Sequence, residues 1–312
     1  MDVSFVVPLF NCLPYTQAMV ASLQASLPAG LAYEIILVDD GSSDGTREWL
    51  AALSDPCRVL LHATNQGYAA ANNHGAALAR GEILVLANND LLFSRGWLEP
   101  ILAAHRRLGP RAGLVGNVQR SVQTGQIDHA GIFINHKGKP EHVRRRPGWL
   151  ARLFAPLRPC PLMTGACVSI RRELWTELGG FDEGYVNGCE DVDLCLRAEA
   201  AGRTNAIALR SSVRHHVSTT PGRKSRDEAN TFRLTLRWQE RLAVLGQPDW
   251  CRHHFETYLP EPRDFPDPAL ARQIACYLLG LRRDPPPQAA AGMRAAIAVE
   301  LTRWRALLPA GS

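Results

Sequence analysis

The chain has 312 residues, 46% of them hydrophobic and 21% charged, with a formal net charge of +5. These values are typical of a globular protein with one or two domains. The positive charge is too small for the dense lysine and arginine surface that marks a nucleic-acid-binding domain, so we expect no nucleic-acid partner.

The N-terminus and the cysteines suggest a cellular compartment. No stretch approaches the roughly 20 apolar residues that cross a bilayer, and the N-terminus has no basic leader and too short an apolar run for a signal peptide. The eight cysteines form no CxxC pair and follow no regular spacing, so we expect reduced thiols rather than disulfides or a zinc site. Together these features predict a cytoplasmic protein.

Short apolar runs alternate with helix-like segments in the first part of the chain. The predicted strands, rich in Val, Ile and Leu and bounded by turn residues, are 4–7, 35–38, 59–61 and 83–86. The predicted helices are 15–27, 46–53, 68–80 and 97–108. Fully apolar strands that alternate with helices are typical of a parallel sheet buried on both faces. We therefore predict an α/β fold with a central sheet flanked by helices.

The rest of the chain is less regular and then becomes helical. We predict strands at 113–119, 127–134 and 168–170, and helices at 171–178 and 191–201. Residues 137–158 form a Pro-, Gly- and Arg-rich connection with a local charge of +6. Beyond residue 221 the pattern predicts amphipathic helices at 230–245, 268–281 and 289–308. These features predict a main domain over 1–225, with halves of about 1–112 and 113–225, and a helical extension over 226–312.

Two predicted strands end in clusters of polar side chains. One runs into Asp39 and Asp40, and another runs into Asn88, Asn89 and Asp90. Ligands of open α/β sheets bind outside the carboxyl ends of the strands. A carboxylate there can accept a hydrogen bond from a base or ribose, and one Asp suffices for Mg²⁺ or Mn²⁺ on a diphosphate, where phosphates and waters supply the other ligands. The alternative in each case is a polar turn that caps the next helix.

A third cluster lies at the predicted start of a helix. Glu190, Asp191 and Asp193 fall within four positions, and Gly179 and Gly180 precede them. Helix capping explains one acid well but three poorly, and paired glycines suggest a close approach of the backbone to another group. We expect Gly188 to allow a tight turn, and Asp193 to pair with Arg197. Glu190 and Asp191 would then be free to face a substrate.

Taken in order, these segments resemble the family-2 glycosyltransferases, which have the Rossmann-like GT-A fold and invert the anomeric configuration. The family's V-D-D-G-S, N-x-G, D-x-D-like, G-G-F-D-E and E-D-x-D-L motifs are matched here at 38–42, 65–67 with 73–75, 88–90, 179–183 and 190–194. A later histidine-containing motif is matched at 215–222, and residues 125–131 resemble an element of bacterial members that build O-antigens and related surface polysaccharides. The resemblance covers about residues 3–240.

The resemblance implies an inverting, metal-dependent glycosyltransferase that moves a hexose or deoxyhexose from a nucleotide-diphosphate donor, with UDP or dTDP favoured, to an acceptor hydroxyl. It implies Asp191 as the catalytic base, with Glu190 and Gly165 at the acceptor. Residues implied in nucleotide binding are Pro8, Asp39, Asp40, Gly67, Asn73 and Asn89. It implies Asp90 and His215 as ligands of Mn²⁺ or Mg²⁺. The acceptor is expected to be a glycan or a lipid-linked or other hydroxyl compound, with peripheral contact at the inner face of the membrane.

The metal motif departs from the family pattern, because Asn88 replaces its first acid. A non-catalytic subunit with the same fold is therefore a second hypothesis, which the intact Glu190–Asp191 pair opposes. A sugar-nucleotide pyrophosphorylase is a third hypothesis. It would carry a Gly-rich basic loop after the first strand, where residues 8–12 of this chain contain neither glycine nor a basic residue. A dehydrogenase is excluded because G-x-G-x-x-G is missing there.

Several further residues carry weaker predictions. Arg144, Arg145 and Arg146 are either a solvated loop or a contact for a phosphate-bearing acceptor. His62 and His74 have no informative spacing and are expected to be surface or hydrogen-bonded structural residues. The apolar stripe of the helical extension is expected to pack on the main domain or on a second copy of the chain in a homo-oligomer. Its members are Leu234, Trp238, Leu242 and Leu245.

Overall fold

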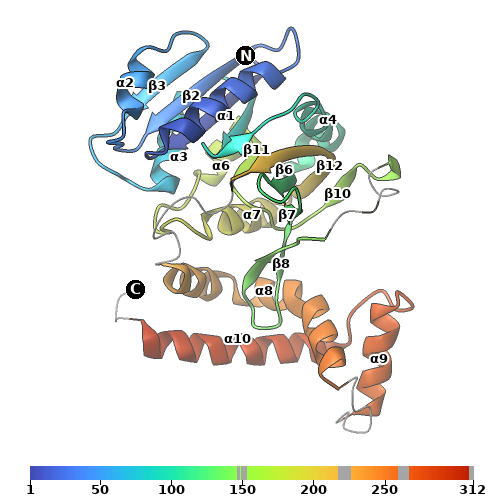
Figure 1. Cartoon of the computed structure of the whole chain (residues 1–312). Coiled ribbons are helices and arrows are strands. Elements are labelled where there is room, and N and C mark those ends of the chain that lie inside the picture. The colour runs from blue at the N-terminus through green and yellow to red at the C-terminus, as the bar shows by residue number, and fades with distance from the viewer. Residues whose placement is uncertain (146–147, 149–152, 217–225, 259–266, 309–312) are drawn as a thin grey trace. The chain divides into compact units, whose positions relative to one another are not determined.

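The computed structural model describes residues 1–145, 148, 153–216, 226–258 and 267–308. The chain divides into two compact units (Figure 1). The first unit comprises Met1–Ile132 and His142–Arg226, and the second comprises Phe133–Glu141 and Asp227–Ser312. From the sequence, residues 133–141 were expected in the main domain. They belong instead to the second unit, because they contact its helices.

A mixed sheet, ten-stranded within the described residues, is the frame of the first unit. The order along its main path is β10–β12–β6–β11–β4–β1–β2–β3, with β5 paired to β12 and β7 to β6. The strand bounds are β1 Val3–Leu9, β2 Tyr33–Asp39, β3 Cys57–Leu61, β4 Ile83–Ala87, β5 Leu91–Leu92, β6 Ala112–Ser121, β7 Ile127–His129, β10 Leu157–Pro159, β11 Cys167–Arg171 and β12 Thr204–His215. The first four predicted strands are confirmed as β1 to β4, and their pairings are parallel.

The second half of the sheet differs more from the sequence prediction. Strand β11 runs antiparallel to both β4 and β6, so the sheet is mixed. The long strand β12 was not predicted, because its second half carries polar residues. The single strand predicted at 127–134 is wrong. It breaks into β7 and β8 (Ile132–Ile134) at Gly131, whose φ of 114° lies outside the range of an extended strand.

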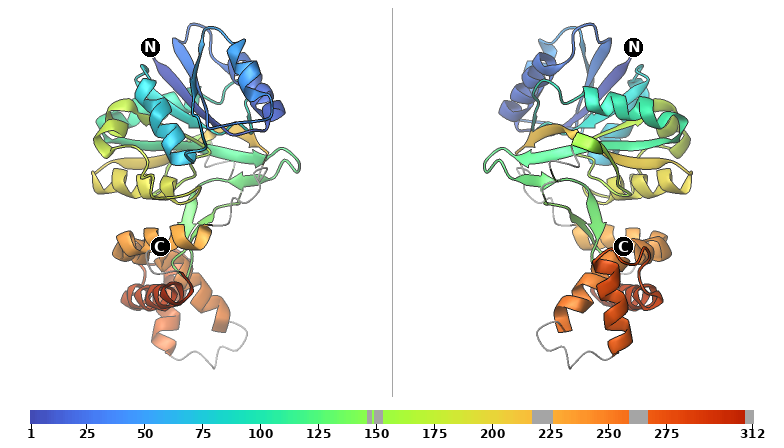
Figure 2. Two further views of the ribbon diagram at one scale, coloured as in Figure 1. Left: turned by 90° about the vertical axis from the view of Figure 1, so that its left-hand side faces the viewer. Right: turned by 90° about the vertical axis from the view of Figure 1, so that its right-hand side faces the viewer.

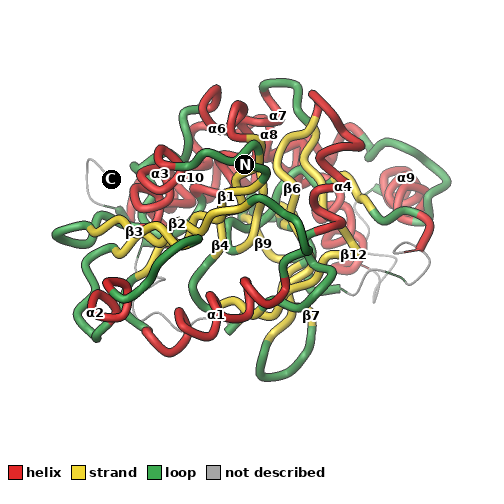
Figure 3. The backbone as a smooth tube through the Cα atoms, turned by 90° about the horizontal axis from the view of Figure 1, so that it is seen from above, coloured by secondary structure: helices red, strands yellow, loops and turns green. Residues whose placement is uncertain are grey.

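Helices cover both faces of the parallel strands. Their bounds are α1 Leu13–Ser26, α2 Thr46–Ala51, α3 Tyr68–Leu78, α4 Glu99–Leu108, α6 Arg172–Leu178 and α7 Glu190–Ala200. In the view from above, α1 and α3 lie on opposite sides of β1 and β2 (Figure 3). Gly75 of α3 is required by this packing, since a Cβ there would lie 2.5 Å from Cγ1 of Val6. The close approach fixes α3, and with it the polar residues at its start.

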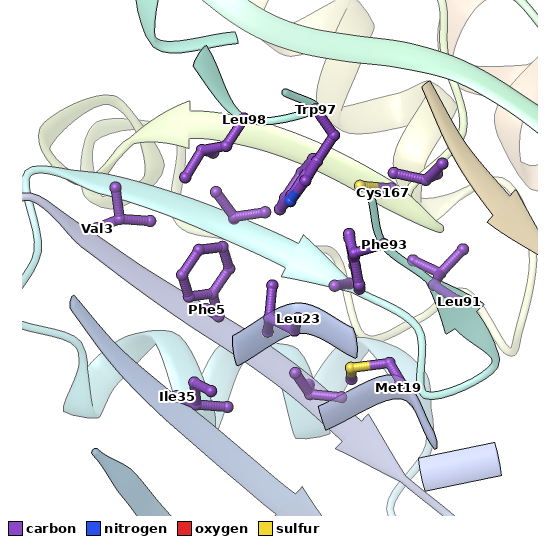
Figure 4. Close-up of a cluster of buried hydrophobic side chains, with 14 of the residues drawn as sticks. Val3, Phe5, Met19, Leu23, Ile35, Leu91, Phe93, Trp97, Leu98 and Cys167 are labelled. Atoms are coloured by element: carbon purple, nitrogen blue, oxygen red, sulfur yellow. The ribbon is translucent and has the colours of Figure 1, made fainter. Parts of the chain in front are cut away.

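The main core of the first unit lies between the sheet and helices α1, α2 and α4. The ring centroids of Phe5 in β1 and Trp97 are 6.2 Å apart, and Met19 and Leu23 of α1 belong to the same cluster (Figure 4). Residues at alternate positions of β2 face the other way and pack with Ala71 of α3. Because both faces of these strands are buried, their sequences are continuous apolar runs rather than alternating ones.

The second unit is helical, with one hairpin. It contains α8 (Asp227–Tyr258), α9 (Pro268–Leu278) and α10 (Pro287–Leu307), coloured orange to red in Figure 2. The hairpin between β8 and β9 (Pro140–His142) contacts these helices, since Lys139 Nζ lies 3.2 Å from Glu300 Oε2. Leu234 and Leu242 of the predicted apolar stripe are fully buried, while the other two members are partly buried. Whether the stripe also serves an oligomer stays a prediction.

Two simpler expectations can be compared with the described residues directly. All eight cysteines lie in the described part of the chain, and each is a free thiol, as predicted. Among the described helices, none is both long and apolar enough to cross a membrane.

Candidate active site

A pocket of about 200 Å³ opens in the first unit where β1, β2 and β4 end. Its lining combines strand ends, the loop before α3, the loop before β11 and the start of α7. The lining residues are Pro8, Leu9, Phe10, Asp40, Asn65, Gly67, Tyr68, Asn88, Asn89, Asp90, Thr164, Gly165, Ala166, Asn187, Glu190 and Asp191. The structure therefore brings together the three clusters that the sequence analysis singled out. Parallel strands deliver their carboxyl ends to one edge, which explains the arrangement.

Asp40 is held by three hydrogen-bond donors. Its Oδ1 accepts the backbone N–H of Gln66 at 2.8 Å, and its Oδ2 accepts that of Gly67 at 2.9 Å. Oδ1 also lies 2.8 Å from Nδ1 of His62, the residue that follows β3. Asp40 as a whole residue is only 4% exposed, yet it lines the pocket. This carboxylate is fixed in orientation before any ligand binds.

Asp39 has a different place from the one expected. It is fully buried, its Oδ2 accepts from Nε of Arg47 at 2.7 Å, and its Oδ1 accepts the N–H of Ser42 at 3.2 Å. It does not line the pocket. The alternation of a strand explains the difference, because adjacent residues point to opposite sides. Asp39 therefore supports the turn, which speaks against the expected contact with a nucleotide.

Asp90 lines the pocket, and His215, which is not among the lining residues, lies next to it although the two are far apart in the sequence. Strand β5 pairs with the end of β12, which brings Nε2 of His215 to 3.2 Å from Oδ1 of Asp90. Its Nδ1 lies 3.9 Å from Oδ2 of Asp128. His215 is 4% exposed, and within the described part of the chain neither of its ring nitrogens makes an aligned hydrogen bond. A buried imidazole next to a carboxylate is a donor set that suits Mn²⁺, whose other ligands phosphates and water can supply.

Glu190 and Asp191 begin α7 and line the pocket. Asp191 is partly exposed, and its Oδ2 accepts the N–H of Gly165 at 2.7 Å while Oδ1 accepts that of Val192 at 2.7 Å. Glu190 accepts the N–H of Gly188 at 2.6 Å. Gly165 is fixed in turn, because its carbonyl accepts the Tyr68 hydroxyl at 3.0 Å. Backbone donors therefore orient Asp191 and leave part of its carboxylate facing the pocket.

The segments around α7 differ in detail from the predictions. The expected pairing of Asp193 with Arg197 is confirmed, with Nε 2.7 Å from Oδ2. The tight turn before the helix does not depend on Gly188, because the left-handed residues there are Asn187, at φ 55°, and Cys189, at φ 70°. The expected close approach at Gly180 is present. A Cβ there would lie 2.4 Å from Oδ1 of Asn73.

Asn73 acts behind the pocket rather than in its wall. Its carboxamide accepts the N–H of Phe181 at 2.9 Å and donates to the carbonyl of the same residue at 2.9 Å. It does not line the pocket, which speaks against the expected nucleotide contact. The same Nδ2 also donates to Oε1 of Glu183 at 2.8 Å, so the side chain ties the segment after Gly180 to α3. Pro8, Gly67, Asn89 and Gly165, by contrast, line the pocket as expected.

Three further residues at the site were not assigned a role from the sequence. Tyr68 and Asn187 line the pocket, and His62 holds Asp40. The strand-end rule that selected Asp40 could have selected His62 too, since it follows the neighbouring parallel strand. Of the arginine cluster, Arg144 and Arg145 are exposed and do not line the pocket. Arg146 and residues 217–222 lie outside the described residues.

Comparison with known proteins gives the family of the chain. The Glycosyl transferase family 2 model matches residues 4–179. An O-antigen biosynthesis protein of Myxococcus xanthus is 30% identical over 80% of this chain and 20% of its own length. An N-acetylglucosaminyl-diphospho-decaprenol L-rhamnosyltransferase of Mycobacterium tuberculosis is 29% identical over 67% of this chain and 74% of its own length. The chain spans less than a third of the length of the first curated relatives it matches.

The fold is also shared with a solved structure. A crystal structure of GalNAc-T7 with UDP, GalNAc and Mn²⁺ matches with a TM-score of 0.62 at 17% identity, covering 88% of this chain and 54% of that one. At this identity the likeness shows the GT-A fold alone. The family match spans more than half of the chain and includes the strand ends that line the pocket. The chain therefore belongs to glycosyl transferase family 2.

Proposed function

We propose that the chain transfers a sugar from a UDP- or dTDP-sugar to an acceptor hydroxyl, with inversion of the anomeric configuration. The observation that carries the proposal is that Asp40, Asp90 and Asp191 line one pocket. The reaction needs one carboxylate to bind the nucleobase, one to bind the metal and one to accept the proton of the acceptor hydroxyl. Asp40 follows β2, Asp90 lies between β4 and β5, and Asp191 is the second residue of α7.

Asp191 is the proposed catalytic base. An inverting transfer needs the acceptor hydroxyl to lose its proton as its oxygen attacks the anomeric carbon from the face opposite the leaving group. Asp191 is oriented by the N–H of Gly165 and partly exposed to the pocket, which suits proton acceptance. A positioned carboxylate contributes roughly 10²- to 10⁴-fold to such a step. Glu190 beside it is proposed to bind the acceptor.

Asp90 and His215 are the proposed ligands of Mn²⁺ or Mg²⁺. Their 3.2 Å approach and burial support this assignment. A divalent cation held there would supply positive charge to offset the negative charge of the departing diphosphate. Asn88 in place of the usual acid leaves fewer negative ligands, so we expect the metal to bind mainly together with the nucleotide.

The hydrogen bonds of Asp40 support a uracil or thymine base. An ionised carboxylate has about four lone-pair sites, and three donors already contact Asp40. Roughly one acceptor site is left, on Oδ2. The imide of uracil or thymine presents a single N–H, whereas guanine presents two adjacent donors that pair best with two free oxygens. UDP or dTDP therefore suits this carboxylate better than GDP.

The acceptor is proposed to be a glycan, with a role in bacterial surface polysaccharide synthesis. Support comes from the names of the relatives, one an O-antigen biosynthesis protein and one a rhamnosyltransferase of a lipid-linked sugar. A lipid-linked acceptor would place the chain beside a membrane. Cytoplasmic location and peripheral membrane contact stay predictions.

The test has two parts. Melting temperatures are measured with UDP, dTDP and GDP, each with and without Mn²⁺, because a ligand that binds only the folded state raises stability. Release of nucleoside diphosphate from UDP- and dTDP-hexoses is then measured with Mn²⁺. The proposal predicts metal-dependent stabilisation and slow donor hydrolysis that Asp191→Asn removes. Stabilisation without any hydrolysis or transfer would instead indicate a non-catalytic subunit.

A further inference from the structure

We propose that His62 is a positioning residue for donor recognition, acting through Asp40. The inference rests on the proposed function, in which Asp40 receives the base. It assigns to His62 a role that the resemblance to the family does not imply. The site of action is the carboxyl edge of β2 and β3, where Asp40 and His62 each follow the last residue of a strand.

The contact between the two residues is buried and short. Nδ1 of His62 lies 2.8 Å from Oδ1 of Asp40, and both residues are less than a tenth exposed. Strands β2 and β3 are parallel neighbours, with Asp39 paired to Leu61 in register. The strand pairing therefore places the next residue of each strand side by side. His62 is held there by its backbone too, since its N–H donates to the carbonyl of Asp39 at 2.8 Å.

The hydrogen-bond partners define which ring nitrogen carries a proton. Asp40 as a carboxylate can only accept, so Nδ1 of His62 is the donor. Nε2 of His62 lies 2.9 Å from Nδ1 of His74, an exposed residue of α3. The two rings meet edge to face, with centroids 4.9 Å apart. With a neutral His62, His74 donates to Nε2 from the side of the ring that faces away from Asp40.

These contacts make the two oxygens of Asp40 different from each other. The donors on Oδ1 are Gln66 N–H and His62 Nδ1–H, while among the residues that the structure describes Oδ2 has only Gly67 N–H. His62 thus occupies the oxygen that is not offered to the ligand and keeps the carboxylate from rotating. Without this donor, Oδ1 would lack one partner and the carboxylate could turn away from the pocket.

Two amide substitutions separate this role from simple packing. The Nδ2 of an asparagine can take the place of Nδ1 of histidine, whereas the Nε2 of a glutamine takes the place of the outer nitrogen. Binding of UDP and dTDP to the full chain is measured by calorimetry with Mn²⁺, together with the melting temperature. We expect His62→Gln to weaken nucleotide binding about tenfold, and His62→Asn to restore it to within about threefold of the unaltered chain.

A modified ligand adds a readout that packing alone does not change. N3-methyl-UDP lacks the imide proton, so the unaltered chain and His62→Asn are expected to bind it about tenfold more weakly than UDP. In His62→Gln this penalty is expected to shrink, because the acceptor is no longer aligned. His74→Ala removes a contact to His62 but none to Asp40, and is expected to weaken binding by about twofold at most.

The outcomes distinguish the inference from the proposed function. The role of His62 would be overturned if the Asn and Gln variants bound UDP equally well, or if His62→Gln kept the full N3-methyl penalty. The proposed function would still stand in either case, provided that the unaltered chain binds UDP. If the unaltered chain bound none of the nucleotides with Mn²⁺, both would be overturned.

Discussion

The turn after β2 and the start of α7 each carry acids, and in both places one acid is structural while another faces the pocket. Asp39 is fully buried on Arg47, and Asp193 is fully buried on Arg197, each pair at 2.7 Å. Asp40 and Asp191 line the pocket instead. The buried member of each pair orders the backbone that presents the other. In both runs of acids, one acid faces the pocket and a neighbouring acid stabilises the backbone that holds it.

Asp40 and Asp191 differ in how their carboxylates are held. Asp40 has three donors and is nearly inaccessible, whereas Asp191 has two backbone donors and is partly exposed. A fixed carboxylate with about one acceptor site left suits recognition of one N–H group. A carboxylate with unused lone pairs suits acceptance of a proton. The predictions below test whether these differences in contacts correspond to differences in function.

Loss of the metal is expected to have the largest effect. EDTA should abolish transfer, and Asp90→Ala should reduce it on the order of 10³-fold, because the cation supplies several kcal/mol of charge stabilisation. The measurement is initial rate against added Mn²⁺. Asn88→Asp is the matched variant, since Asn88 lines the same pocket and adding an acid there should tighten Mn²⁺ binding without nucleotide. Full activity of thoroughly chelated protein would contradict a metal-dependent mechanism.

The adjacent acids after β2 should give opposite results when altered. Asp40→Ala should weaken UDP or dTDP binding by about tenfold to a hundredfold, because the acceptor for the base is lost. Asp39→Asn should leave binding nearly intact but lower the free energy of unfolding by about 1–3 kcal/mol, since Arg47 is itself partly exposed. Calorimetry and urea unfolding on both variants check this contrast. Similar binding losses in both would remove the distinction drawn between the two acids.

A buried histidine outside the pocket, His105, makes the stability of the fold depend on pH. Burial and the charge of Arg171 lower the pKa of His105 to about 4, and its Nε2 lies 2.9 Å from the hydroxyl of Ser169. The unfolded pKa is about 6.5, so the unfolded chain binds more protons between these values and stability falls as pH drops through this window. The loss should approach about 3 kcal/mol near pH 4. His105→Gln should flatten this part of the curve in urea unfolding; an unchanged curve would contradict it.

The sequence predicted the parts of the molecule that depend on local patterns. Continuous apolar runs gave β1 to β4, and the strand-end rule found Asp40 and Asp90. The strand-end rule could not show which of Asp39 and Asp40 faces the pocket, because the answer depends on which side of the strand Arg47 occupies. Asn73 was misplaced because its partner, Phe181, is remote in the chain. Strand β12 was missed, and with it the pairing that brings His215 to Asp90.

The proposed base can be tested directly by comparing two acids of α7. Asp191→Asn keeps the size of the side chain and at least one of its two backbone hydrogen bonds, but cannot take up the acceptor proton. We predict a loss in kcat on the order of 10²-fold or more, with donor affinity nearly unchanged. Asp193→Asn, on the fully buried partner of Arg197, should instead lower the melting temperature with turnover largely retained.

The decisive measurement is kcat, donor affinity and melting temperature on the same preparation of Asp191→Asn. Our account predicts that kcat collapses while the other two change little, since the asparagine costs only about 1 kcal/mol of stability. If Asp191 only caps α7, the variant will turn over like the unaltered chain with a slightly lower melting temperature. Wild-type turnover by Asp191→Asn would contradict the proposed mechanism.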